Sequence, residues 1–141
     1  MMRITKLFCF VFFMFTAITS VNAETAGKGK QFNWGPVMDA IGKVESSGNS
    51  RAVNGAHVGI LQISPVLVTE CNKILKSQGS KKRYSLNDRY SAVKSREMFV
   101  LIQSVHNPRN SVERAIRSWH GGINYSVAKT QRYYRKVMNH L

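Results

Sequence analysis

One glutamate occupies a position that suits a general acid. Apolar residues recur at helical spacing from Val37 to Val44, and Glu45 follows at the edge of that stripe, in the last turn before the turn-forming residues 46–49. A carboxyl group there is partly shielded from water and lies at the negative end of the helix dipole, and both effects raise its pKa. A carboxyl group that stays protonated near neutral pH can act as a general acid. From this helix alone, a Glu45 that points into solvent is an equal alternative.

Three motifs that begin at Glu45 resemble those of the soluble lytic transglycosylases. Glu45-Ser46 and a polar loop lead to residues 59–65 (GILQISP), which are similar to the family's Gly-Leu-x-Gln-Ile/Leu-x-Pro. Residues 115–122 (AIRSWHGG) resemble its Ala-x-x-Ala-Tyr-Asn-Ala-Gly segment, and residues 130–137 (TQRYYRKV) resemble its closing Thr-x-x-Tyr-x-x-x-Val. The motifs stand in the family's order, although the related G-type lysozymes carry similar ones.

The resemblance implies a lysozyme-like helical fold with Glu45 as the one catalytic residue. In such enzymes a single carboxyl group cleaves the β-1,4 bond between N-acetylmuramic acid and N-acetylglucosamine, and the muramic acid 6-hydroxyl closes a 1,6-anhydro ring. The resemblance further implies that Ser46 and Gln62 line the substrate cleft and that Tyr133 lies near Glu45. The alternatives are a hydrolytic muramidase of the same fold and a non-catalytic, basic wall-binding module.

The chain departs from the family at Trp119 and His120, where tyrosine and asparagine are expected. Trp119 suits stacking on a sugar, but its position seven residues after Val112 suits core packing equally well. His120 places a titratable group where the family has an amide, and it either binds substrate or holds a loop. On the last helix we expect Tyr133 at the edge of the apolar stripe and Tyr134 facing the core, with an exchange of these roles as the alternative.

Hydrophobic periodicity predicts a mainly α-helical single domain, with at most a short extended piece in the loop of residues 51–63. The five expected helices cover residues 34–45, 65–75, about 87–106, 111–120 and about 125–141, and Asn33 and Ser64 are the expected caps of the first two. The expected core-facing stripe of the third helix is Met98, Leu101, Ile102 and Val105, and that of the last helix is Val127, Thr130, Tyr134, Val137, Met138 and Leu141.

Residues 1–23 have the layout of a cleaved secretory signal peptide. Arg3 and Lys6 precede an apolar run from Leu7 to Ile18, and the segment ends in the small-residue sequence Val21–Ala23. The run is shorter than the roughly 20 residues that a membrane-spanning helix needs. We therefore expect an exported bacterial protein, periplasmic or secreted, with no integral membrane span. Residues 24–31 are expected to form a flexible leader and residues 32–141 the catalytic domain.

The charge of the chain points to an anionic partner. The 141 residues contain 21 Lys and Arg and 7 Asp and Glu; without the two basic residues of the signal, the net charge is 21 − 2 − 7 = +12. We expect peptidoglycan strands as the partner, and the small size suggests a component of a secretion or conjugation machinery as another. Metal, cofactor and nucleic acid are not expected, because no motif for them occurs. We expect a monomer, with Cys71 as a buried apolar residue.

Overall fold

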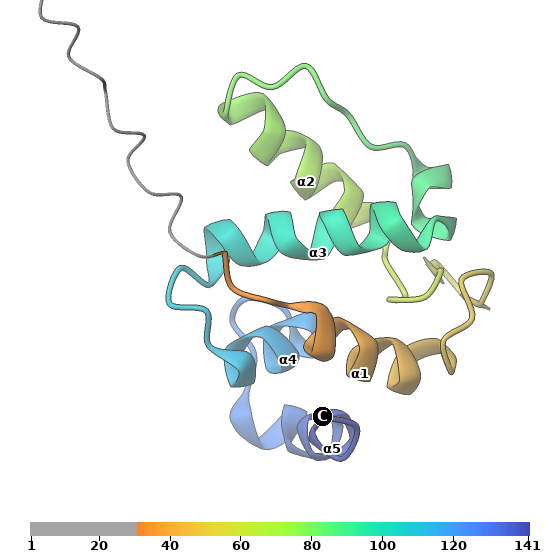
Figure 1. Cartoon of the computed structure of the whole chain (residues 1–141), viewed down its shortest axis with the longest axis vertical. Coiled ribbons are helices and arrows are strands. Elements are labelled where there is room, and N and C mark those ends of the chain that lie inside the picture. Colours follow the sequence, from red (N-terminus) through yellow and green to blue (C-terminus); the bar gives the residue numbers. More distant parts are fainter. Residues whose placement is uncertain (1–30) are drawn as a thin grey trace, which may run out of the picture. The chain divides into compact units, whose positions relative to one another are not determined.

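Five α-helices and one short hairpin make up most of the regular structure of residues 31–141, the part of the chain that the computed structural model describes (Figure 1). The predicted signal peptide, and the predicted leader except Gln31, lie outside the described residues. The helices are α1 (Gly35–Ser46), α2 (Pro65–Ser77), α3 (Ala92–His106), α4 (Val112–Gly121) and α5 (Val127–Met138), with a 3-10 helix η1 (Leu86–Tyr90) before α3 and the hairpin strands β1 (Val53–Asn54) and β2 (His57–Val58) after α1. Among the described helices, none is both long enough and apolar enough to cross a membrane.

Serine side chains cap four of the five α-helices. Each accepts a hydrogen bond from the backbone N–H three residues later, at 3.2–3.4 Å, and the four are Ser64, Ser91, Ser111 and Ser126. Such a cap contributes about 1 kcal/mol. At α1 the expected cap, Asn33, instead accepts from the backbone N–H of Gly35 at 3.0 Å, and Trp34 occupies the N-cap position without a capping hydrogen bond from its side chain.

The core lies on both sides of α3, which passes between α2 and the pair α1 and α4 in Figure 1. Phe99 of α3 is fully buried, and its ring contacts Trp34 (centroids 5.7 Å apart) and Trp119 of α4 (4.8 Å). α5 packs against α1 and α4. Three aromatic rings from distant parts of the sequence thus join α1, α3 and α4 at one point.

The third helix differs from the prediction in its start and its buried face. It begins at Ala92, because residues 86–90 form η1, and its buried residues are Ser95, Met98, Phe99 and Gln103. Val105 is exposed, and Leu101 and Ile102 are only half-buried. The polar residues can face inward because they are hydrogen-bonded: Ser95 donates to the carbonyl oxygen of Arg89 at 3.0 Å, and Gln103 accepts from Asn107 at 3.0 Å.

The buried face of α5 is also rotated from the predicted one. Thr130, Tyr133 and Val137 are buried, whereas Val127, Met138 and the following Leu141 are exposed. The reason is Arg117 of α4, a buried side chain whose guanidinium donates to the carbonyl oxygen of Val127 and to the side chains of Thr130 and Gln131. The same guanidinium lies 4.2 Å from the ring centre of Tyr134, which is half-buried and packs against the core, whereas Tyr133 is buried.

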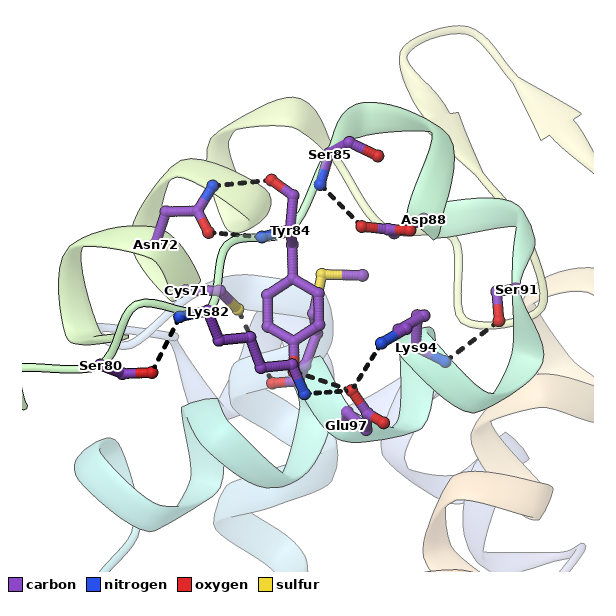
Figure 2. A network of polar contacts seen from close by, with 11 residues as sticks. Cys71, Asn72, Ser80, Lys82, Tyr84, Ser85, Asp88, Ser91, Lys94 and Glu97 are labelled. Atoms are coloured by element: carbon purple, nitrogen blue, oxygen red, sulfur yellow. Dashed lines mark hydrogen bonds and ion pairs between the residues drawn. The ribbon is translucent and has the colours of Figure 1, made fainter. Parts of the chain in front are cut away.

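A second polar network fixes the basic connection between α2 and η1 (Figure 2). The side chain of Asn72 exchanges two 2.8 Å hydrogen bonds with the backbone of Tyr84, and the Tyr84 hydroxyl donates to Glu97 at 3.1 Å. Glu97 also pairs with Lys82 at 2.6 Å. The nearby Cys71 is fully buried, as predicted, and burial raises the pKa of its thiol to about 12.

Candidate active site at Glu45

The loop between α1 and α2 is held in place by η1. The buried side chain of Arg89 donates to the carbonyl oxygens of Ala56 in the hairpin (2.9 Å) and of Ile63 at the end of the loop (3.2 Å). Gly59 has a φ of 82°, and a Cβ at this position would lie 1.9 Å from the Arg89 carbonyl oxygen. Only glycine allows this approach. The hairpin therefore has a fixed position relative to η1.

Ser46 joins the end of α1 to this loop. Its hydroxyl lies 3.0 Å from the carbonyl oxygen of Gly42 and 2.8 Å from that of Ile60. The next residue, Ser47, adopts a left-handed conformation that ends the helix. Ser46 was predicted to line the cleft, but its hydroxyl instead hydrogen-bonds to backbone carbonyls, and Ser46 lines none of the cavities described below. Its contacts set the position of Glu45 next to it.

Glu45 is hydrogen-bonded to a residue of α5, which in turn stacks on a residue of α4. The hydroxyl of Tyr133, on α5, donates to Glu45 Oε1 at 2.7 Å. The ring of His120, at the end of α4, stacks on the Tyr133 ring with centroids 4.2 Å apart and planes 9° apart. Because Arg117 joins α4 to α5, it also fixes the relative positions of His120 and Tyr133. Three of the predicted site residues therefore lie together.

The environment of Glu45 favours its protonated form. Burial of the carboxyl group raises its pKa above the ordinary value, and this effect outweighs three opposing ones: the hydrogen bond from Tyr133, and the positive charge of His120 and of His57 when they are protonated. Burial and the neighbouring Glu45 carboxylate also raise the pKa of the Tyr133 hydroxyl, which keeps it a hydrogen-bond donor.

Glu45 faces a cavity of about 320 Å³, which we call the Glu45 cleft. Its lining residues come from α1, the hairpin, the start of α2 and the end of α4, and they are Glu45, Asn54, His57, Gln62, Ser64, Leu67, Trp119 and His120. A second cavity, of about 470 Å³, shares Glu45 and His120 with it and extends along α5. A third, of about 340 Å³, shares Ser64, Leu67 and Trp119 and is largely apolar. We call these three adjoining cavities the groove; Glu45 lines two of them.

Gln62 and Trp119 form the wall of the cleft opposite Glu45's own helix. The Gln62 amide nitrogen donates to the carbonyl oxygens of Gly59 (2.9 Å) and Ala52 (3.3 Å), and the residue has a φ of 51°. This left-handed conformation costs energy for a non-glycine residue and is enriched at functional sites. The indole N–H of Trp119 donates to the carbonyl oxygen of Leu61 at 3.0 Å, and its ring contacts Phe99 in the core while the side chain also lines the cleft.

The structure brings five of the six predicted site residues to the groove and leaves one out. Glu45, Gln62, Trp119 and His120 line the Glu45 cleft, and Tyr133 lines the adjoining cavity, whereas Ser46 lines neither. Sequence reasoning missed Asn54, His57, Ser64 and Leu67 as lining residues. An available signal was Gly55, which together with Ala56 forms a two-residue hairpin turn and places His57 beside Asn54.

Glu45 is the only carboxylate among the described residues that lines the cleft or the cavity along α5. Glu70 lines the third cavity, where it pairs with His106. The remaining described carboxylates lie outside the three cavities: Asp39 pairs with Arg96, Asp88 with the backbone of Ser85, Glu97 with Lys82 and Glu113 with Arg117. In residues 31–141, no three side chains of the metal-binding types gather in one place.

Comparison of the chain with protein-family models, with curated proteins and with solved structures finds no significant match. The geometry around Glu45 is therefore the basis on which a function is assigned.

Proposed function

We propose that this protein is a peptidoglycan lytic transglycosylase with a lysozyme-like fold and Glu45 as its catalytic acid and base. The observation that carries the proposal is a half-buried carboxyl group, hydrogen-bonded to Tyr133 and open to a groove, without a second carboxylate beside it. The motif resemblance from Glu45 to Val137 supports the substrate class. Export to the periplasm or the medium is part of the same proposal.

The first step uses the protonated form of Glu45. Because burial raises the pKa of Glu45, its carboxyl group can hold the proton that the leaving glycosidic oxygen needs. Once the proton has left, the Tyr133 hydroxyl, 2.7 Å from Oε1, stabilises the carboxylate. Burial favours the protonated form of Glu45 and the Tyr133 hydrogen bond favours the carboxylate, and a residue that first donates and then accepts a proton must adopt both forms.

The second step explains why one carboxylate suffices. A retaining glycosidase needs a second carboxylate about 5–5.5 Å away as nucleophile, and an inverting one needs a base about 6.5–9.5 Å away to activate water. Apart from Glu45, no described carboxylate lines the cleft or the cavity along α5. In the proposed reaction the muramic acid 6-hydroxyl attacks C1 and the Glu45 carboxylate takes its proton, so the 1,6-anhydro ring closes. Intramolecular attack benefits from the high effective concentration of a tethered nucleophile.

The groove offers the contacts that a neutral amino sugar needs. The Gln62 side-chain oxygen accepts no hydrogen bond from the described residues and suits a sugar hydroxyl or an acetamido N–H. Trp119 offers an indole ring to a pyranose face, and the largely apolar cavity beyond it suits acetyl methyl groups. Asn54 and His57 from the hairpin add polar contacts on the side of the cleft away from α5.

Mass spectrometry of the products tests the proposal. The purified protein is incubated with peptidoglycan, alongside the Glu45→Gln variant and a matched control, Asp39→Asn, which neutralises an exposed carboxylate on the same helix. We expect soluble muropeptides with 1,6-anhydro ends from the wild type and the control, and none from Glu45→Gln.

Each of the other possible results supports a different function. Reducing muramic acid ends, heavier by one water, would show a hydrolytic muramidase instead. Binding to the wall without products would show a non-catalytic wall-binding module. Equal product formation by Glu45→Gln would exclude Glu45 as the catalytic residue.

A further inference from the structure

The exposed face of α5 is strongly basic where it borders the groove. Lys129, Arg132 and Lys136 are exposed and line the cavity that also contains Glu45 and Tyr133. α5 contains no Asp or Glu, and among the described residues none of these three cations forms an ion pair with a carboxylate. Arg135 continues the basic surface on the neighbouring side of the helix. These cations are therefore available to an external anion.

Helix geometry directs part of this surface toward the catalytic residue. Lys129 and Lys136 stand four residues before and three residues after Tyr133, so both lie on the same side of α5 as the residue that contacts Glu45. The other end of the groove, near Trp119, is largely apolar. The groove is thus asymmetric, with lysine and arginine side chains only on the α5 side of Glu45.

We propose that Lys129, Arg132 and Lys136 form a subsite for carboxylates carried by the same glycan strand whose sugars occupy the Glu45 cleft. This inference rests on the proposed function. In peptidoglycan, every second sugar carries a lactyl group that ends either in a free carboxylate or in a peptide with carboxylates of its own. A strand that lies along the groove brings these anions over α5, and the positive charge fixes which sugar lies on the α5 side of Glu45.

Binding experiments with a catalytically silent protein separate this subsite from sugar recognition. In the Glu45→Gln background, the α5 variant Lys129→Gln/Arg132→Gln/Lys136→Gln is compared with the control Lys73→Gln/Lys76→Gln/Lys81→Gln. The control removes the same charge from exposed positions that line none of the cavities described above. The ligands are chitohexaose, which has no carboxylate; glycan strands stripped of peptides, which keep the lactyl carboxylate; and peptide-bearing strands.

We expect the α5 variant to bind carboxylate-bearing strands about tenfold more weakly than its parent at low salt, which corresponds to about 1.4 kcal/mol. The difference shrinks as ionic strength rises, because exposed charges are screened. Binding of chitohexaose stays the same, and the control variant matches its parent on all ligands. A loss with stripped strands assigns the anion to the lactyl group, and a loss with peptide-bearing strands alone assigns it to the peptide. The double variant Lys129→Arg/Lys136→Arg keeps the charge and is expected to keep the binding.

Three results would overturn the subsite. The first is an equal loss of affinity for glycan strands in the α5 and control variants, and the second is an unchanged affinity of the α5 variant for every strand. The third comes from a further ligand, vesicles of phosphatidylglycerol and phosphatidylethanolamine: the α5 variant loses affinity for these vesicles and for no strand. If the wild type releases products but any of these results is obtained, the inference fails and the proposed function stands. If the wild type releases no products and the silent protein binds no strand, the proposed function fails and the inference fails with it.

Discussion

Replacing Tyr133 with phenylalanine removes one hydroxyl group and isolates the hydrogen bond to Glu45. The ring keeps its buried position and its stack on His120 at 4.2 Å, while the 2.7 Å bond to Oε1 is lost. A hydrogen bond to a charged group contributes about 1.5–3 kcal/mol and one between neutral groups about 0.5–1.5 kcal/mol. Because Glu45 is only half-buried, we expect the lower part of each range. Tyr133→Phe should reduce the free energy of unfolding by about 1.5–2 kcal/mol when Glu45 is ionised and by about 0.5–1 kcal/mol when it is protonated.

The sign of the pH dependence follows from which form the bond favours. The Tyr133 hydroxyl stabilises the carboxylate and lowers the pKa of Glu45, so its removal raises that pKa further. Urea unfolding at about pH 8.5 and about pH 3.5 measures the two losses in stability, and ¹³C NMR of labelled glutamate carboxyls follows the titration of Glu45 directly. If the protein cleaves peptidoglycan as proposed, the alkaline limb of its pH–rate profile moves to higher pH in the variant.

Tyr134→Phe is the matched control for this experiment. It removes the same atom one residue later, from a hydroxyl that forms no hydrogen bond with the described residues, and it keeps the ring under the Arg117 guanidinium. We expect a change of less than about 0.5 kcal/mol at both pH values. A Tyr133→Phe loss that is the same at both pH values, or a fall in the pKa of Glu45, would refute the reasoning.

Three further changes test other parts of the site. Because the pKa of Glu45 is raised in the folded protein, the native state holds this proton more tightly than the unfolded state, and ionisation of Glu45 lowers stability as pH rises. Glu45→Gln should therefore raise the free energy of unfolding at about pH 8 and leave it unchanged at about pH 3. An equal effect at both pH values would contradict the burial argument. Gly59→Ala should lower the free energy of unfolding, measured with urea, by about 3 kcal/mol or more, because the new Cβ would lie 1.9 Å from the Arg89 carbonyl oxygen. Its control Gly48→Ala, at a position with a similar φ but open space, should lower it by about 1 kcal/mol. Similar losses in the two variants would disprove the close packing of the loop. Trp119→Phe removes the 3.0 Å bond to Leu61 and should cost about 1–2 kcal/mol in the same assay, while a loss below about 0.5 kcal/mol would show that the bond is not needed.

The helices could be predicted because their signals are local. Ser64 and Ser111 each start a helix by bonding the backbone N–H three residues later, and residues 46–49 end α1 where expected. The short hairpin also fell within the predicted loop. In each case, residues within a few positions of one another supply both the signal and the interaction.

The buried faces of α3 and α5 could not be predicted in the same way. Periodicity places apolar residues inside, but Ser95 and Gln103 are buried because hydrogen bonds to the carbonyl oxygen of Arg89 and from the side chain of Asn107 satisfy them. On α5, Thr130 is buried with the Arg117 guanidinium of the preceding helix as its partner, and the half-buried Tyr134 ring lies against the same guanidinium. A buried polar side chain is favourable only with its partner, and the partner is known only once the chain is folded.

The same distinction between local and tertiary interactions applies to the candidate site. The sequence by itself determined that Glu45 ends an amphipathic helix at the edge of its apolar face, which is enough to make it a candidate acid. Only the tertiary structure decided that Tyr133, 88 residues later, donates to Glu45, that His57 lines its cleft and that Ser46 binds backbone carbonyls instead. The pKa of a carboxyl group depends on burial and on neighbours within a few ångströms, and for Glu45 those neighbours come from three separate segments of the chain.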